Sequence, residues 1–290
     1  MSASASPTLH DLHTHSRASD GAYTPSELVQ HAAAAGIRML ALTDHDTTSG
    51  ITEARQAADQ AGIQLIAGVE ISVTWEKKVI HLVALNINPD HDTLKQGLAS
   101  LQAIRQERAR EMGQRLARAG IPNLYDAASE MAGNGMITRT HFAHHLVELG
   151  LAADMRDVFN RYLTPGKPGY VSVQWATLEN AIEWTRQAGG LTAIAHPQRY
   201  PLTKSWMRRL LGEFKEMGGT ALEVLSGTAP PGDVQASAEL ARRFDLLASC
   251  GSDFHNPAYQ WPKLGRLPPM PKGLIPVWEM FEARDEPSPH

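Results

Sequence analysis

The sequence predicts an α/β fold built on a sheet whose strands alternate with helices. Three observations predict it: short apolar runs of strand length recur, helix start and stop signals stand between several of them, and polar residues follow the runs. Such alternation is typical of a parallel sheet with right-handed crossovers, in which ligands bind at the carboxyl ends of the strands. At 290 residues the chain can bury the core of such a domain, so its size permits an enzyme.

Residues 11–21, Asp-Leu-His-Thr-His-Ser-Arg-Ala-Ser-Asp-Gly, are expected to form the first strand and the loop that follows it. Residues two apart on a strand share a face, so His13 and His15 project side by side and can grip one metal ion. Asp20, on the following loop, can carry a carboxylate back over the same spot to bind a second ion or orient the first. A single His-x-His pair is more often a chance pairing or a surface strand. The metal prediction therefore depends on matching ligands elsewhere in the chain.

A helix start signal follows this loop. Thr-Pro-Ser-Glu at 24–27 supplies an N-cap, a proline at the first helical position and the glutamate of a capping box, and the helix is expected to end at Gly36. Residues 37–43 are almost all apolar, as in a strand buried on both faces. His45 follows this run between two aspartates, so polar groups again collect at a strand end.

Two further strands are expected before the middle of the chain. After a helix over 48–61, residues 64–69 form an apolar run that ends in Glu70. The next run, 79–85, carries His81 among apolar neighbours. A carboxylate and an imidazole thus join the candidate ligands.

Three later strands repeat the pattern, over 191–195, 221–225 and 246–251. The first of them leads directly into His196. The last leads into Asp253 and His255, which are two apart like the first histidine pair. The candidate ligands that follow these strands are therefore expected to form one functional site at the carboxyl end of the sheet.

Residues 101–168 have a different character and are mainly helical by pattern. We expect them to form a small insertion that covers the mouth of the main domain, which comprises residues 8–100 and 169–290. Arg105 and Arg108 are three apart on the first, charged helix and so share a face.

Composition excludes several classes of protein. The net charge of -4 and the isoelectric point near 6.3 argue against bulk electrostatic binding of long nucleic acid, but they leave room for a small anionic substrate. A single cysteine excludes an intramolecular disulfide. The absence of a membrane-spanning apolar run and of a signal-peptide pattern predicts a cytoplasmic protein without a membrane partner.

Six histidines and three carboxylates at strand ends are too many for coincidence, and they predict a centre of several metal ions. Imidazole and carboxylate without thiolate suit manganese, zinc or ferrous iron. We expect two or three divalent ions, manganese first, with Glu70 as a bridge between two of them. The remaining histidines that carry no distinguishing placement are His10, His31, His91, His144, His145 and His290.

These motifs closely resemble the polymerase and histidinol phosphatase (PHP) family. The resemblance rests on Asp-Leu-His-x-His-Ser at 11–16, Thr-Asp-His at 43–45, Gly-Val-Glu at 68–70, His81, Ala-His-Pro at 195–197 and Gly-Ser-Asp-Phe-His at 251–255. Residues 138–142 and 162–170 of the insertion resemble the nucleoside 3',5'-bisphosphate phosphatases, relatives of the short-RNA exonuclease ribonuclease AM. The resemblance implies a distorted seven-stranded β/α barrel.

The resemblance also implies three sets of metal ligands. They are His13, His15, Glu70 and Asp253 for one ion, Glu70, His81 and His196 for a second, and Asp20, His45 and His255 for a third. Hydrolysis would then proceed by in-line attack of a metal-bridging hydroxide on a phosphoryl group. His255 or Asp20 would protonate the leaving oxygen if the third ion is absent.

Specificity is expected from groups that bind phosphate. Arg105 and Arg108 are candidates, although from pattern alone they could equally form a solvated surface with Glu107 and Glu111. The other candidate substrate contacts are Thr138, Arg139 and His141 near a helix start, and Lys167 and Arg199 in second rank.

Basic groups apart from the metals would recognise a substrate with two phosphates. We therefore expect hydrolysis of the 3'-phosphate of nucleoside 3',5'-bisphosphates, giving 5'-nucleotides. The alternatives are a 5'-to-3' exoribonuclease acting on short 5'-phosphorylated RNA, a histidinol phosphatase, and a metal-stabilised scaffold without catalysis.

Overall fold

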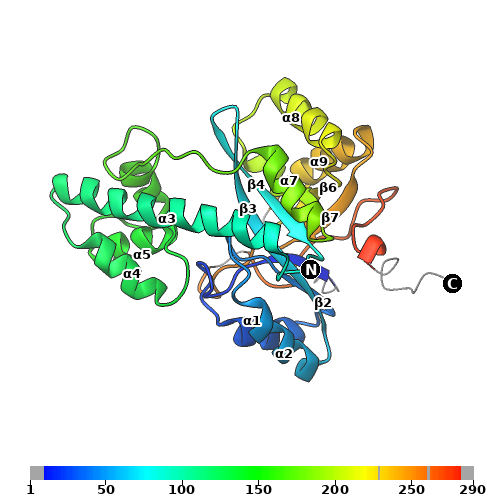
Figure 1. Ribbon diagram of the computed structural model, residues 1–290, viewed down its shortest axis with the longest axis horizontal. Coiled ribbons are helices and arrows are strands. Elements are labelled where there is room, and N and C mark those ends of the chain that lie inside the picture. The colour runs from blue at the N-terminus through cyan, green and yellow to red at the C-terminus, as the bar shows by residue number, and fades with distance from the viewer. Residues whose placement is uncertain (1–9, 228, 260–261, 282–290) are drawn as a thin grey trace, which may run out of the picture.

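Seven strands form one sheet in chain order in the computed structural model, which describes residues 10–227, 229–259 and 262–281 (Figure 1). They are β1 (His10–Thr14), β2 (Met39–Leu42), β3 (Gln64–Trp75), β4 (Lys78–Leu85), β5 (Leu191–Ile194), β6 (Ala221–Ser226) and β7 (Leu247–Gly251). The backbone of His15 donates to Phe254 at 3.0 Å, and that of Asp253 donates to His13 at 2.8 Å, so the first and last strands meet. The expected distorted seven-stranded barrel is confirmed.

Strand β4 runs antiparallel to both of its neighbours, so the expectation of a parallel sheet is wrong at this strand. The cause is a two-residue turn, Glu76 and Lys77, whose φ angles of 47° and 63° reverse the chain directly and leave no room for a crossover helix. Strand β3 also continues to Trp75, so Glu70 lies inside it and does not end it. Because β4 is reversed, His81 near its start reaches the same barrel end as the other candidate ligands.

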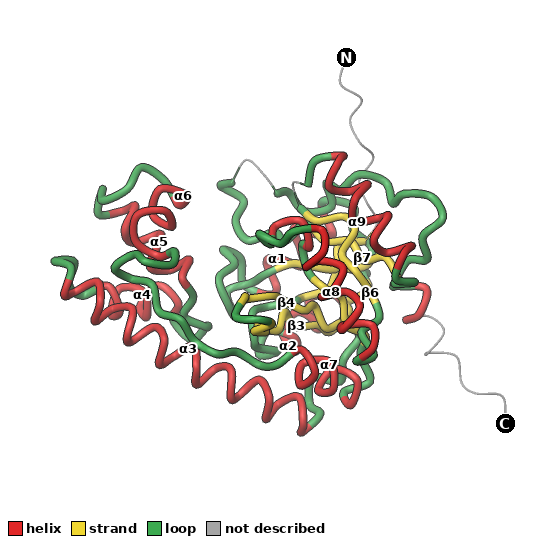
Figure 2. The backbone as a smooth tube through the Cα atoms, turned by 90° about the horizontal axis from the view of Figure 1, so that it is seen from above, coloured by secondary structure: helices red, strands yellow, loops and turns green. Residues whose placement is uncertain are grey.

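Helices surround the barrel on its outer side (Figure 2). They are α1 (Pro25–Ala34), α2 (Ile51–Ala61), α7 (Leu178–Gln187), α8 (Lys204–Glu216) and α9 (Pro231–Arg243). The capping box at Thr24 and Glu27 is present as expected, whereas α2 begins three residues later than expected. Alternate residues of β2 belong to different cores: Leu40 packs with the helices, and Ala41 packs inside the barrel with Val83 and Phe281.

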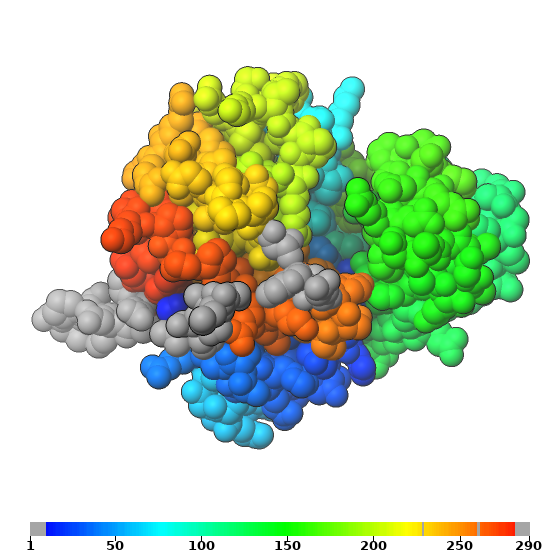
Figure 3. Space-filling view, turned by 180° about the vertical axis from the view of Figure 1, so that it is seen from behind, coloured from blue at the N-terminus to red at the C-terminus, as the bar shows by residue number. Residues whose placement is uncertain are grey.

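The middle of the chain forms a helical lobe beside the barrel (Figure 3). It contains α3 (Asp92–Arg118), α4 (Leu124–Ala132), α5 (Arg139–Glu148), α6 (Met155–Val158) and a π-helical turn, η1 (Phe159–Leu163). Its own hydrophobic core extends from Ala109 to Val171. Helix α3 begins against the barrel, where Gly97 packs on Trp184 of α7, and continues into the lobe. The domain boundaries at residues 101 and 168 stay a prediction.

Within the described residues, no helix combines the length and the apolar character needed to cross a bilayer. The expected cytoplasmic location stays a prediction.

Candidate metal centre and anion site

The side chains expected as metal ligands converge at one end of the barrel around Glu70. The Glu70 Oε2 atom lies 3.5 Å from Nε2 of His13 and 3.4 Å from Nε2 of His15. The other oxygen, Oε1, lies 2.8 Å from Nδ1 of His81 and 3.1 Å from Nε2 of His196. Glu70 therefore stands between two groups of imidazoles, the position that a bridging carboxylate requires.

Two further carboxylates complete the cluster. Asp253 Oδ1 lies 3.2 Å from Nε2 of His15 and 3.5 Å from Nε2 of His13. Asp20 Oδ1 lies 3.4 Å from Nε2 of His255 and 3.9 Å from Nε2 of His45. The structure thus brings all nine residues together, in an arrangement compatible with the three expected sets.

The local backbone directs these side chains inward. His196 and Asp253 follow strands β5 and β7 with φ angles of 29° and 55°, conformations that non-glycine residues rarely adopt and that concentrate at functional sites. At Gly251, a Cβ atom would lie 2.1 Å from Cβ of His13. Only glycine therefore lets β7 approach β1 closely enough to place Asp253 beside the first histidine pair.

The loop that carries Asp20 is held by a buried carboxylate that the sequence analysis did not assign to the site. Asp44 accepts hydrogen bonds from the Ser16 amide at 2.8 Å and from the hydroxyls of Ser16 and Ser19, each at 2.6 Å. Burial raises the pKa of Asp44 to about 6, although these hydrogen bonds oppose the rise. Asp44 thus fixes the loop between β1 and α1.

Glu223 on β6 is the second residue that sequence reasoning missed. Its Oε2 atom lies 2.7 Å from Nδ1 of His13, and both side chains are buried. The contact fixes the ring so that Nε2 faces Glu70 and Asp253. The available signal was an acidic residue inside an otherwise apolar strand.

The cluster leaves several polar atoms buried without a hydrogen bond among the described residues. They include Nε2 of His13, Nε2 of His15, Oε2 of Glu70 and Oδ1 of Asp20. Each such atom costs about 1–3 kcal/mol unless a partner satisfies it. Imidazole nitrogens and carboxylate oxygens are ligands of divalent cations, so the cluster is able to bind metal ions.

The protonation states of His15 and Glu70 favour metal binding. Burial, reinforced by the positive charge of His255, lowers the pKa of His15 to about 3, so this imidazole is neutral at pH 7. Burial tends to raise the pKa of Glu70, but His45, His81 and His13 outweigh it and hold that pKa well below its usual value. A neutral imidazole and an ionised carboxylate are the forms that bind cations.

Arg105 on α3 is a buried anchor. Its Nε donates to Asp46 at 2.6 Å and its Nη2 donates to Ser72 at 2.9 Å, which ties the helix to the barrel. The solvated salt bridges of α3 are formed by other arginines. They are Arg110 with Glu107 at 3.6 Å and Arg115 with Glu111 at 2.7 Å.

Three arginines nevertheless gather beside the cluster. The guanidinium groups of Arg105 and Arg108 lie 5.2 and 5.5 Å from the ring centre of Trp175. Burial, together with the charges of Arg139 and Arg105, lowers the pKa of Arg108 to about 9. Burial and Arg105 likewise lower the pKa of Arg139. Such crowded, desolvated cations favour an anion between them.

The other expected substrate contacts divide into two groups. The hydroxyls of Thr138 and Thr140 donate to Oδ2 of Asp20 at 3.1 and 2.9 Å, so the lobe is bonded directly to a candidate ligand. His141 Nδ1 accepts from the Thr138 amide at 3.0 Å and caps α5. Arg199 pairs with Asp253 and so lies at the cluster, whereas Lys167 lies exposed in the turn after η1.

Comparison with known proteins identifies the family. The model of the PHP domain matches residues 11–171. The chain belongs to the PHP family. A 3',5'-nucleoside bisphosphate phosphatase of Chromobacterium violaceum is 48% identical to this PHP protein over 275 residues, covering 94% of this chain and 96% of the relative. A 5'-3' exoribonuclease of Haemophilus influenzae is 46% identical over 272 residues, covering 94% and 98%.

Solved structures agree with this PHP assignment. An amidohydrolase from Chromobacterium violaceum, with bound sulfate and no metal, superposes with a TM-score of 0.91 at 47% identity, covering 96% of this chain and 97% of that one. A metal-dependent phosphoesterase, described as putative, from Bifidobacterium adolescentis superposes with a TM-score of 0.79 at 28% identity, covering 95% and 96%.

Proposed function

We propose that this PHP protein is a metal-dependent phosphoesterase that removes the 3'-phosphate from nucleoside 3',5'-bisphosphates and releases 5'-nucleotides. The observation that carries the proposal is the position of the arginines next to the candidate metal centre. Arg139 interacts electrostatically with Asp20, and Arg105 with His45. One phosphate can thus rest on Arg108 and Arg139 while a second reaches the cluster.

The cluster would hold two or three divalent ions, for which we propose manganese, in the three ligand sets expected from the resemblance. When bound, such ions neutralise charge on the phosphoryl group and lower the pKa of a water nucleophile. His13, with Glu223 behind it, would present Nε2 in a fixed orientation. Glu70 would belong to two of these ligand sets.

The leaving 3'-oxygen needs a proton, and we propose that His255 supplies it when the third ligand set holds no ion. Burial opposes the charged form of His255, but Asp20 and Asp253 outweigh burial and raise its pKa to about 10. Without bound metal, this imidazole therefore holds a proton at pH 7 beside Asp20.

The names of relatives support two substrates. The phosphatase of Chromobacterium violaceum supports a nucleoside bisphosphate. The exoribonuclease of Haemophilus influenzae and the exoribonuclease Rnm of Escherichia coli, 44% identical over 276 residues, support short 5'-phosphorylated RNA as a second candidate. Both substrates carry a 5'-phosphate and a phosphate on the 3'-oxygen. Histidinol phosphate is disfavoured because its ammonium group would face the three arginines.

Phosphate release with manganese present tests the proposal. Adenosine 3',5'-bisphosphate should give 5'-AMP, whereas 5'-AMP, 3'-AMP and histidinol phosphate should react at least tenfold more slowly. His13→Ala should abolish the reaction, and His31→Ala, which alters an exposed histidine stacked on Tyr23, should preserve it. Equal rates with 3'-AMP would contradict recognition of the second phosphate, and activity on histidinol phosphate alone would refute the substrate class.

A further inference from the structure

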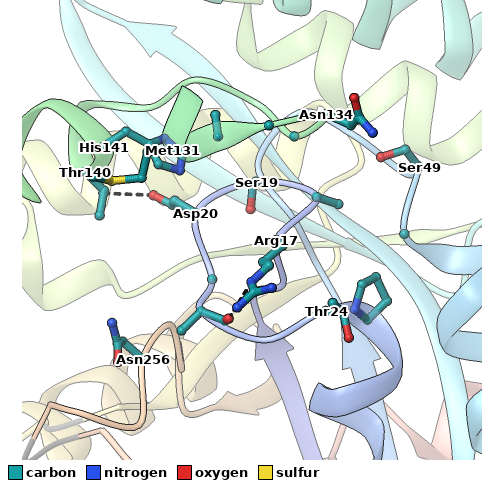
Figure 4. Close-up of a pocket in the computed structure, with 18 of the residues that line it drawn as sticks. Arg17, Ser19, Asp20, Thr24, Ser49, Met131, Asn134, Thr140, His141 and Asn256 are labelled. Atoms are coloured by element: carbon teal, nitrogen blue, oxygen red, sulfur yellow. Dashed lines mark hydrogen bonds between the residues drawn. The ribbon is translucent and has the colours of Figure 1, made fainter. Parts of the chain in front are cut away.

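A cavity of about 890 Å³ adjoins Asp20 and follows the seam between the helical lobe and the barrel (Figure 4). Its walls come from residues 17–25 after β1, residues 49–53 at the start of α2, residues 131–148 of the lobe, and Asn256 after β7. The function proposed above makes no use of this space. Its volume is in the range of small-molecule binding sites.

The two walls of the cavity are joined firmly. The Met136 amide of the lobe donates to the Ala18 carbonyl of the barrel at 3.0 Å. At Gly135 a Cβ atom would lie 2.2 Å from the Arg17 carbonyl oxygen, so only glycine allows this approach. These two contacts hold the lobe against the barrel beside the cavity.

The cavity shares Asp20 and helix α5 with the site described above. Asp20 lines the cavity, and its Oδ1 atom faces His45 and His255 of the metal cluster. Figure 4 shows Thr140 and His141, from the first turn of α5, beside Asp20. The neighbouring Arg139 belongs to the arginine group and does not line the cavity. A substrate whose 5'-phosphate rests on the arginines and whose 3'-phosphate reaches the cluster would thus continue toward this space.

The lining suits the neutral part of a nucleotide. The amides of Asn134 and Asn256 offer both donors and acceptors, as the edge of a base requires. The His144 ring lines the cavity and is held parallel to the neighbouring ring of Tyr259, at an interplanar angle of 2° and a centroid distance of 6.4 Å, and Met131 adds an apolar surface to the lining. Bases stack on aromatic rings of this kind in single-strand binding proteins.

The charges on the lining exclude a long polyanion as the preferred occupant. Arg17 lines the cavity, but so do Glu53 and Glu148. Glu53 accepts hydrogen bonds from Ser26, and Glu148 lies 3.1 Å from Nδ1 of His145. The cavity therefore lacks the excess of positive charge that a chain of phosphates needs.

We propose that this cavity binds the second nucleoside of a short 5'-phosphorylated RNA, the one joined through its 5'-oxygen to the scissile phosphate. This inference rests on the proposed function and extends it to diesters. Water attacks phosphorus and the bond from phosphorus to the first 3'-oxygen breaks. The first nucleotide leaves as a 5'-monophosphate with a 3'-hydroxyl, and the remainder keeps the phosphate at its 5' end. A nucleoside bisphosphate leaves the cavity unused.

Filling the cavity tests this assignment. Asn134 is exposed in the loop after α4, and Asn134→Trp would place an indole in the space for the second nucleoside. We expect kcat/KM for a 5'-phosphorylated trinucleotide to fall at least tenfold, while kcat/KM for adenosine 3',5'-bisphosphate stays within twofold. Asn180→Trp, at an exposed position on α7 outside the cavity, should change neither value.

A second variant tests the stacking surface. His144→Ala should raise KM for the trinucleotide at least threefold without changing KM for the bisphosphate, and melting temperatures verify that both variants are folded. An unchanged trinucleotide rate in both variants, or an equal fall for both substrates, would overturn the assignment. Failure of the unaltered protein to cleave the trinucleotide while it hydrolyses the bisphosphate would also overturn it and spare the proposed function. Failure on both substrates would refute the proposed function itself.

Discussion

Replacing Glu223 with glutamine tests whether a carboxylate outside the ligand set controls the metal centre. Glu223 lies 2.7 Å from Nδ1 of His13, and both side chains are about 1% exposed. Burial opposes the charged form of His13, but Glu223, Glu70 and Asp253 outweigh it and hold its pKa well above the usual value. Glutamine keeps the shape of the side chain and removes the charge.

The expected magnitude follows from the change in this one contact. A hydrogen bond to a charged group contributes about 1.5–3 kcal/mol and a neutral one about 0.5–1.5 kcal/mol. The variant should therefore lose about 1–1.5 kcal/mol of metal-binding free energy, which is roughly a tenfold rise in Kd. Glu223→Ala removes the contact altogether and should raise Kd by roughly a hundredfold, the upper end for partners of metal-bound histidines.

Titration of manganese against a fluorescent chelator at pH 7.5 measures both values. Glu239→Gln, a matched change at an exposed position on α9, serves as the control and should leave Kd unaltered. A Kd for Glu223→Gln equal to that of the unaltered protein would refute the reasoning, because His13 would then be oriented without its buried partner. A loss of activity at saturating manganese with unchanged affinity would point instead to a role in the chemical step.

Three further outcomes are expected. Asp46→Ala leaves Arg105 buried without its carboxylate partner, so urea titration should show a free energy of unfolding lower by about 3–5 kcal/mol. A loss under about 1 kcal/mol would show that α3 is anchored by other contacts. Arg108→Met should raise KM for adenosine 3',5'-bisphosphate at least tenfold with a smaller change for 3'-AMP, and equal changes would exclude a contact with the 5'-phosphate. In metal-stripped protein, the carboxylates of Asp20 and Asp253 raise the pKa of His255 from 6.5 to about 10 against the effect of burial, so the folded state binds the extra proton. This contribution to stability is complete below pH 6.5 and is lost as pH rises toward 10. The free energy of unfolding, measured by urea titration, should therefore fall over this pH interval, and it should fall less steeply in His255→Asn.

Local signals in the sequence predicted the parts of the fold that depend on neighbouring residues. The capping box at residues 24–27 needs only contacts three residues apart, and it formed as expected. Eight of the nine candidate ligands were found because each stands in or close to an apolar strand, where a polar side chain is costly without a partner, and Asp20 was found on the loop after the first of these strands. Strand β4 was predicted as a strand, but its direction was not, because the direction depends on a two-residue turn while the apolar pattern is the same either way.

The sequence by itself determined which residues could bind metal and phosphate, because residue chemistry and strand position are encoded locally. Only the tertiary structure decided how these residues are partnered. Asp46 and Arg105 are 59 positions apart, and Glu223 and His13 are 210 apart, so no spacing rule connects them. A charged side chain on a helix looks the same in sequence whether it meets solvent, a substrate or a buried carboxylate. Tertiary packing determines its partner, because the free-energy cost of burying a charge is offset only where the fold places an opposite charge beside it.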